Sequence, residues 1–185
     1  MSSAERGKIL LAIARAAIGS AFGRTLPPDT SAPWLTEAGA TFITLTQNNG
    51  ELRGCIGSLE AHRPLLEDVQ ANARAAAFRD PRFAPLTEDE FERTRVEVSL
   101  LSPMQPLAFR DEQDALAQLR PGVDGVLLEY GHHRGTFLPQ VWEQLPRKED
   151  FMTHLKHKAG LPPDFWAEGV KLSRYTVEKW KENAS

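Results

Sequence analysis

The sequence contains a single cysteine, Cys55, in 185 residues. One thiol cannot form an internal disulfide, and it cannot supply the several thiolates that a cysteine-based zinc or iron–sulfur site requires. No apolar run reaches the roughly 18 residues that indicate a membrane-spanning helix. The first apolar segment is interrupted by Arg15, which is not the layout of a signal peptide. We therefore expect a cytoplasmic protein with no membrane segment.

The sequence also lacks an excess of positive charge. It has 22 Lys and Arg against 25 Asp and Glu, and a formal net charge of −3. Residues 84–146 carry 5 basic and 11 acidic side chains. Proteins that bind duplex nucleic acid by neutralising phosphates usually carry a strong basic excess. We therefore expect no duplex partner, although a small basic pocket for one nucleotide or anion stays compatible with this composition.

Cofactor motifs are missing as well. The sequence has no Gly-x-Gly-x-x-Gly run, no Walker loop and no cluster of three cysteines. His154 and His157 lie three residues apart on a predicted helix, but two imidazoles without a nearby carboxylate are a weak metal signal. We expect no cofactor and no metal.

The length predicts roughly one domain, or one domain with a small second lobe. Hairpins and separated helices occur without a regular alternation of strand and helix, which predicts an α+β fold. We expect an antiparallel sheet with flanking helices and a smaller second lobe. Residues 1–185 are treated as a single domain of two closely packed lobes.

Helix starts are marked by two capping boxes, Ser2 with Glu5 and Thr87 with Glu90. Apolar residues at steps of three and four indicate helices, and β-branched alternation indicates strands. The predicted helices cover residues 9–18, 64–78, 111–119 and 148–159, with a short one after residue 87. The predicted strands cover residues 41–46, 52–58, 96–101, 126–130, 136–138 and 170–177.

The pair Asn49-Gly50 between two strand-like runs is a strong hairpin signal. A two-residue turn there fixes the register, in which Thr44 opposes Cys55 and Thr46 opposes Arg53. Because side chains alternate across a strand, one face is predicted to be core and the other semi-polar. The predicted core face holds Ile43, Leu45, Leu52 and Ile56, and the semi-polar face holds Thr44, Thr46, Arg53 and Cys55.

Cys55 is the first candidate for chemistry. An arginine on the same face, Arg53, would favour the thiolate and so a reactive cysteine. The neighbouring Gly54 and Gly57 are typical of a bulge or of close approach by a ligand or another backbone. The alternative is that Cys55 is a small buried hydrophobe and that a glycine makes room for an aromatic ring.

Two acidic residues extend this candidate site. Asp80 lies in the loop Asp80-Pro81-Arg82-Phe83, and loops commonly display binding groups, although Asp80 could equally pair with Arg82 or Arg79 and do nothing else. Glu97 lies in an apolar strand, either on a solvated face or as the buried partner of an arginine such as Arg53 or Arg82. The candidate constellation is Arg53, Cys55, Arg82 and Glu97.

The run Leu52-Arg53-Gly54-Cys55-Ile56-Gly57 closely resembles the signature of the AMMECR family. Other segments resemble further family blocks in the same order, and together they cover most of residues 40 to 177. These segments include residues 80–83, 97–101, 121–126, 136–142 and 155–161.

The resemblance implies an α+β fold and a role as component A of an AmmeMemoRadiSam-type system, with a Memo-like protein and a radical SAM protein as partners. It implies no settled substrate. Carried over position by position, it gives Arg53, Gly54, Cys55 and Gly57 as the first site residues, followed by Asp80, Arg82, Glu97, Gln140 and Lys158.

Three functions are compatible with these residues. The first is an enzyme or enzyme subunit acting on a small anionic or nucleotide-like substrate, with Cys55 and Glu97 as catalytic candidates. Arg53 and Arg82 would then bind anionic oxygens, which a planar guanidinium suits. The second is a non-catalytic binding or scaffold module for the Memo-like and radical SAM partners. The third is a weak binder of single-stranded RNA or nucleotides.

Overall fold

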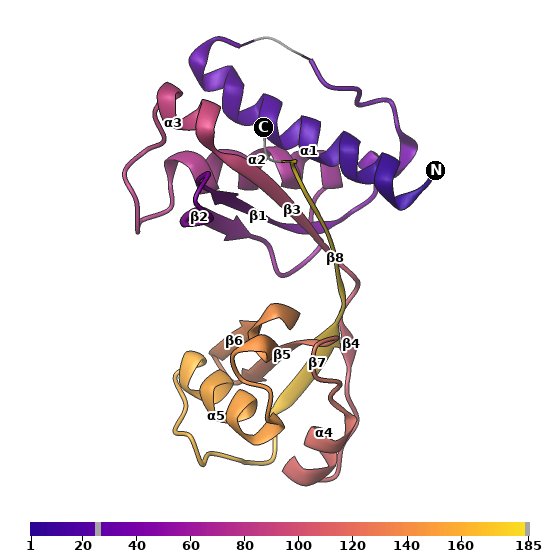
Figure 1. Cartoon of the computed structure of the whole chain (residues 1–185). Helices are drawn as coiled ribbons and strands as arrows, with labels where there is room; N and C mark the ends of the chain where they lie inside the picture. Colours follow the sequence, from indigo (N-terminus) through magenta and orange to yellow (C-terminus); the bar gives the residue numbers. More distant parts are fainter. Residues whose placement is uncertain (25–26, 184–185) are drawn as a thin grey trace. The chain divides into compact units, whose positions relative to one another are not determined.

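The computed structural model describes residues 1–24 and 27–183. In this part of the chain, helices accompany two four-stranded sheets, so the expected α+β class is confirmed. The chain divides into two compact units: Met1–Leu101 together with the segment from Glu178 onward, and Ser102–Val177 (Figure 1). No helix of the described residues is both long and apolar enough to cross a membrane.

The helices of the first unit begin where the sequence predicts. Ser2 and Glu5 form a complete capping box at the start of the first helix, and Thr87 and Glu90 form the second. Each box satisfies backbone N–H groups that a helix start leaves without partners. The helical segments are α1 (Ser3–Gly19), η1 (Ser20–Phe22), η2 (Pro33–Thr36), α2 (Leu65–Phe78) and α3 (Glu88–Arg93).

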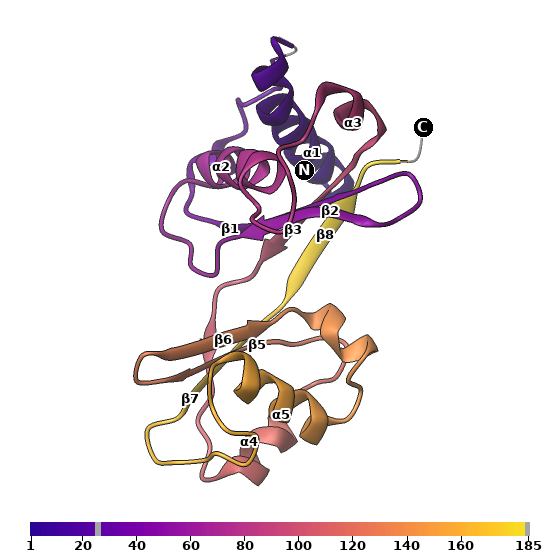
Figure 2. The same cartoon turned by 90° about the vertical axis from the view of Figure 1, so that its left-hand side faces the viewer.

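The first sheet has the strand order β2-β1-β3-β8. Its strands are β1 (Ala40–Thr46), β2 (Leu52–Gly57), β3 (Arg95–Leu101) and β8 (Val177–Lys181). The helices α1 and α2 lie on one side of this sheet (Figure 2), where Ile43, Leu45, Val96 and Val98 are buried in the core. The opposite face, which carries Thr44 and its cross-strand neighbours, is therefore free of helices from this unit.

The register of the β1–β2 hairpin is confirmed in part. Thr44 pairs with Cys55 as predicted, but Thr46 pairs with Leu52, so the predicted pairing of Thr46 with Arg53 is wrong. The register shifts between Leu45 and Thr46. Strand β2 has one extra residue there, Arg53, which forms a β-bulge. Leu52 is 41% exposed and does not belong to the core, contrary to the prediction.

The second unit contains the sheet of order β4-β7-β5-β6, and its core includes a stacked pair of rings, Trp142 and Phe151, with centroids 3.7 Å apart. The strand predicted over residues 170–177 is divided, because its last residue begins β8 of the first sheet. The elements of this unit are β4 (Gln105–Pro106), α4 (Glu112–Gln118), β5 (Gly125–Tyr130), β6 (His133–Phe137), η3 (Pro139–Glu143), α5 (Lys148–Lys158) and β7 (Lys171–Tyr175).

Candidate functional site

Strand β2 is the edge of the first sheet, and its outward backbone groups are paired with side chains. The N–H of Cys55 donates to Asp80 Oδ2 at 3.0 Å, and Arg82 Nη2 donates to the Cys55 carbonyl at 3.4 Å. Arg82 also donates through Nε and Nη2 to the Asp80 carboxylate. The loop from Asp80 to Arg82 thus takes the place of a further strand and covers an edge that would otherwise be open to pairing.

Asp80 is buried and ionised. Hydrogen bonds from the Arg82 side chain are the largest cause that holds the pKa of Asp80 well below its usual range, against burial, which raises that pKa. The backbone N–H groups of Cys55 and Arg82 act in the same direction as the guanidinium. The same contact raises the pKa of Arg82. The predicted Asp80–Arg82 pairing is therefore present, and it positions a guanidinium beside Cys55.

The thiol of Cys55 lies in a row of polar side chains across the sheet. Its Sγ is half-buried and 3.4 Å from Thr44 Oγ1. Thr44 is the direct cross-strand partner of Cys55 on one side and of Glu97 on the other, so all three share the sheet face opposite α1 and α2. Glu97 Oε1 lies 3.9 Å from Lys179 Nζ. We call Arg82, Cys55, Thr44, Glu97 and Lys179 the polar row.

Arg53 does not belong to this row. Its guanidinium donates to Glu90 through Nε at 2.7 Å and Nη2 at 3.1 Å, and Nη2 also donates to the Ala84 carbonyl at 2.7 Å. Hydrogen bonds from Arg53 are the largest cause that lowers the pKa of Glu90 to about 2. Because of the bulge, Arg53 does not lie opposite Thr46. Its carboxylate partner is Glu90, not Glu97 as the sequence suggests. The cation that contacts Cys55 is Arg82, through the backbone carbonyl of Cys55.

The two glycines of the motif accommodate close packing. A Cβ atom on Gly54 would lie 2.1 Å from the backbone oxygen of Ala76 in α2. A Cβ atom on Gly57 would lie 2.2 Å from Cγ of the Phe42 ring. Gly54 therefore allows close approach of another backbone, and Gly57 makes room for an aromatic ring, both of which were among the sequence interpretations.

Two of the predicted site residues belong to the second unit. Gln140 is exposed in η3. Lys158 ends α5, donates from Nζ to the Thr136 carbonyl at 2.8 Å, and lies over the Phe137 ring at 5.2 Å from its centroid. The polar row is formed without them.

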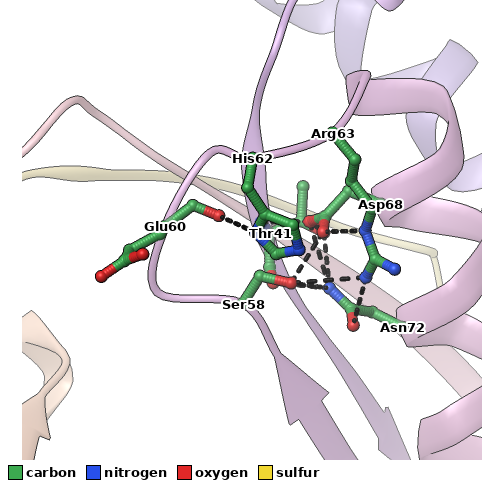
Figure 3. A network of polar contacts seen from close by, with 7 residues as sticks. All are labelled: Thr41, Ser58, Glu60, His62, Arg63, Asp68 and Asn72. Carbon is green, nitrogen blue, oxygen red and sulfur yellow. Dashed lines mark hydrogen bonds and ion pairs between the residues drawn. The ribbon is translucent and has the colours of Figure 1, made fainter.

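The sequence reasoning missed a buried polar network at the start of α2 (Figure 3). Asp68, which is 0% exposed, accepts hydrogen bonds from the N–H and Oγ1 of Thr41, from Ser58 Oγ and from Arg63 Nε. Asn72 Nδ2 donates to Asp68 Oδ2 and to the Thr41 carbonyl. A signal existed, because Asp68 and Asn72 fall four residues apart on the apolar face of this helix.

The described residues contain no group of three or more His, Cys, Asp or Glu side chains that could hold a metal ion. His62, which follows β2, is exposed, and its Nδ1 lies 3.0 Å from the Glu60 carbonyl.

Comparison with known proteins identifies the family. The AMMECR1 family model matches residues 11–180. The chain belongs to the AMMECR1 family. Protein MJ0810 of Methanocaldococcus jannaschii is 38% identical over 186 residues, which cover 96% of this chain and 90% of that protein. A protein of Methanothermobacter thermautotrophicus is 38% identical over 192 residues, covering 98% of this chain and 96% of that protein.

A solved structure agrees with this AMMECR1 assignment. The crystal structure of the uncharacterized protein PH0010 from Pyrococcus horikoshii matches with a TM-score of 0.86 and 34% sequence identity. The match covers 97% of this chain and 93% of that chain. The family resemblance seen in the sequence is therefore confirmed, and so is the fold that it implied.

Proposed function

We propose that this AMMECR1-family protein binds a small anionic ligand on the polar row. In this proposal it is the cytoplasmic component A of an AmmeMemoRadiSam-type system, and its partners are a Memo-like protein and a radical SAM protein. One observation supports the ligand site: a half-buried thiol, a hydroxyl and a carboxylate lie side by side on the sheet face opposite α1 and α2. Lys179 lies near the carboxylate, and Arg82 donates to the carbonyl of Cys55.

Arg82 provides the anion-binding capacity. Its side chain is 54% exposed although it is paired with Asp80. A guanidinium carries five N–H donors, and the hydrogen bonds of Arg82 to side chains and carbonyls of the described residues use only Nε and Nη2. The N–H groups of Nη1 remain for a ligand, and hydrogen bonds from an arginine to an anionic oxygen are among the stronger ones in proteins.

The row favours binding over catalysis by this chain alone. A nucleophilic cysteine generally needs a base within hydrogen-bond reach. In the part of the chain that the structure describes, Thr44 is the side chain in hydrogen-bond contact with Cys55 Sγ. A threonine hydroxyl is not a base at neutral pH. We therefore assign ligand binding to this chain, as an enzyme subunit, and the bond-making chemistry to its partners.

The rate of Cys55 alkylation tests the ligand site, because Cys55 is the only thiol. We expect pyrophosphate to slow the reaction of the native protein with iodoacetamide in a saturable way. Arg82→Gln should weaken that protection at least about tenfold, since hydrogen bonds to charged groups contribute about 1.5–3 kcal/mol. The matched control is Arg79→Gln, which removes the same charge from an exposed neighbour and should leave protection unchanged.

Two results would contradict the proposal. If neither phosphate nor pyrophosphate protects Cys55 or binds by calorimetry, the polar row is not an anion site. If purified Memo-like and radical SAM proteins fail to retain the wild-type chain in a pull-down, the partner assignment is wrong. Retention without any anion binding would favour the scaffold function.

A further inference from the structure

The aromatic ring of Phe42 packs with one face against strand β2. A Cβ atom at Gly57 would lie 2.2 Å from Cγ, 2.4 Å from Cδ2 and 2.5 Å from Cδ1 of this ring. Such nearly equal distances to Cγ and both ortho carbons place the glycine below the plane of the ring rather than at its edge. Phe42 and Gly57 are direct cross-strand partners. One face of the Phe42 ring therefore packs against the backbone of Gly57.

Phe42 is not part of either hydrophobic core. It is half-buried and belongs to neither of the two core clusters, nor to the partly buried residues packed against them. Among the described residues, no aromatic ring and no cation is stacked on it. Burial in a core therefore does not account for an aromatic side chain at this position.

The ring is adjacent to the polar row. Phe42 pairs with Gly57 on one side and Ser99 on the other, while Thr44 pairs with Cys55 and Glu97. Phe42 and Thr44 are two residues apart on β1, so these two parallel lines of side chains are roughly 7 Å apart on the same face. A planar molecule stacked on the ring would extend its edge over Thr44 and Glu97.

We propose that the ligand of the polar row is a nucleotide, or a similar planar heterocycle carrying an anionic group, and that Phe42 is its stacking platform. This inference rests on the proposed function and names its ligand class. The ring would stack on Phe42, an N–H group at its edge would donate to the Glu97 carboxylate, and the anionic group would reach Arg82. Stacking of a base on an aromatic side chain tolerates any base, because every base has a π-face.

Calorimetry with matched ligands tests the platform. The probes are the four ribonucleoside 5′-monophosphates and ribose 5-phosphate, which keeps the sugar and the anion but lacks the base. We expect at least one monophosphate to bind the wild-type protein at least about fivefold more tightly than ribose 5-phosphate, the lower end of the range for one stacked base. Phe42→Leu should remove that preference and leave the affinity for ribose 5-phosphate within twofold, while Phe42→Tyr should retain it.

The outcomes separate this inference from the proposed function. If ribose 5-phosphate and pyrophosphate bind but no monophosphate binds more tightly, the stacking platform is wrong and the anion site stands. If none of these probes binds, both proposals fail. Should Phe42→Leu not fold, Gly57→Ala provides a second variant, because the added methyl displaces the ring. Gly57→Ala should lose the preference for monophosphates as well. If the wild-type protein binds no monophosphate more tightly than ribose 5-phosphate, the stacking platform is wrong whatever the variants show.

Discussion

Arg53 and Glu90 form a two-point ion pair that joins β2 to α3, with Nε–Oε2 and Nη2–Oε1 distances of 2.7 and 3.1 Å. Arg53 is only 6% exposed, so its charge depends on this partner. The same carboxylate accepts the backbone N–H of Thr87 at 3.1 Å within the capping box of α3. One glutamate therefore both closes a helix start and neutralises a buried guanidinium.

Glu90→Gln should lower the free energy of unfolding at pH 7 by about 3 kcal/mol, because it leaves the Arg53 guanidinium buried without its counter-charge. The pKa of Glu90 falls on folding from an ordinary 4.5 to about 2. The stabilisation is therefore complete above pH 4.5 and is lost as the pH falls from 4.5 through about 2. Urea unfolding of the wild type and of Glu90→Gln at several pH values measures this pH dependence of the free energy of unfolding.

The control for that variant is Glu92→Gln on the same helix. Its partner Arg24 and Glu92 itself are largely exposed, so a change of at most about 1 kcal/mol is expected. The difference between wild type and Glu90→Gln should shrink below pH 4.5. A difference that is equally large at pH 3 and pH 7 would show that the ion pair does not carry the effect.

Gly54→Ala and Gly57→Ala should differ in cost although both glycines lie in one strand. The new methyl at Gly54 meets the Ala76 backbone oxygen at 2.1 Å, and a helix backbone cannot yield without moving α2. Overpacking of this kind costs about 3 kcal/mol or more. The methyl at Gly57 meets only the Phe42 side chain, which can turn away, so about 1 kcal/mol is expected. Equal melting temperatures for the two variants would refute this distinction.

The Asp68 network should contribute strongly to stability. Asp68→Ala leaves the N–H of Thr41 and the Arg63 Nε without their acceptor, and we expect a loss of about 3 kcal/mol from unpaired buried groups. Glu67→Ala is the matched control, because Glu67 precedes it on the same helix and is exposed. Denaturant unfolding of both variants measures the difference. A loss no larger than that of Glu67→Ala would mean that water replaces the network.

Local signals in the sequence were sufficient for much of the fold. The capping boxes at Ser2 and Thr87 predicted two helix starts, because a cap depends on residues three apart. The hairpin predicted from Asn49-Gly50 is present, but the expected two-residue turn is wrong, because the N–H of Gln47 donates to the carbonyl of Glu51 and three residues lie between them. Thr44 still pairs with Cys55, because the bulge in β2 offsets this difference of one residue. The division of residues 170–177 between two sheets was missed, since strand partners far along the chain leave no local pattern.

The sequence predicted the candidate site only where the alternation of side chains along a strand determines the sheet face on which a residue lies. Cys55 and Glu97 fall on one face because each opposes Thr44. The partner of Arg53 was not predictable, because one inserted residue in β2 redirects its side chain, and nothing in the hairpin pattern marks that bulge.

Thr44→Val and Thr46→Val are the same substitution two residues apart, and we expect them to change different properties of the protein. Thr46 Oγ1 is buried and has no hydrogen-bond partner within the described residues. Replacing an unpaired buried hydroxyl with an isosteric methyl removes a desolvation cost, so Thr46→Val should raise the free energy of unfolding by about 1 kcal/mol. Thr44 Oγ1 contacts Cys55 Sγ at 3.4 Å, so Thr44→Val removes the hydrogen-bond partner of the thiol and should change the rate of Cys55 alkylation, whereas Thr46→Val should leave that rate unchanged. An alkylation rate that responds equally to both variants would show that Thr44 acts on the thiol only through packing.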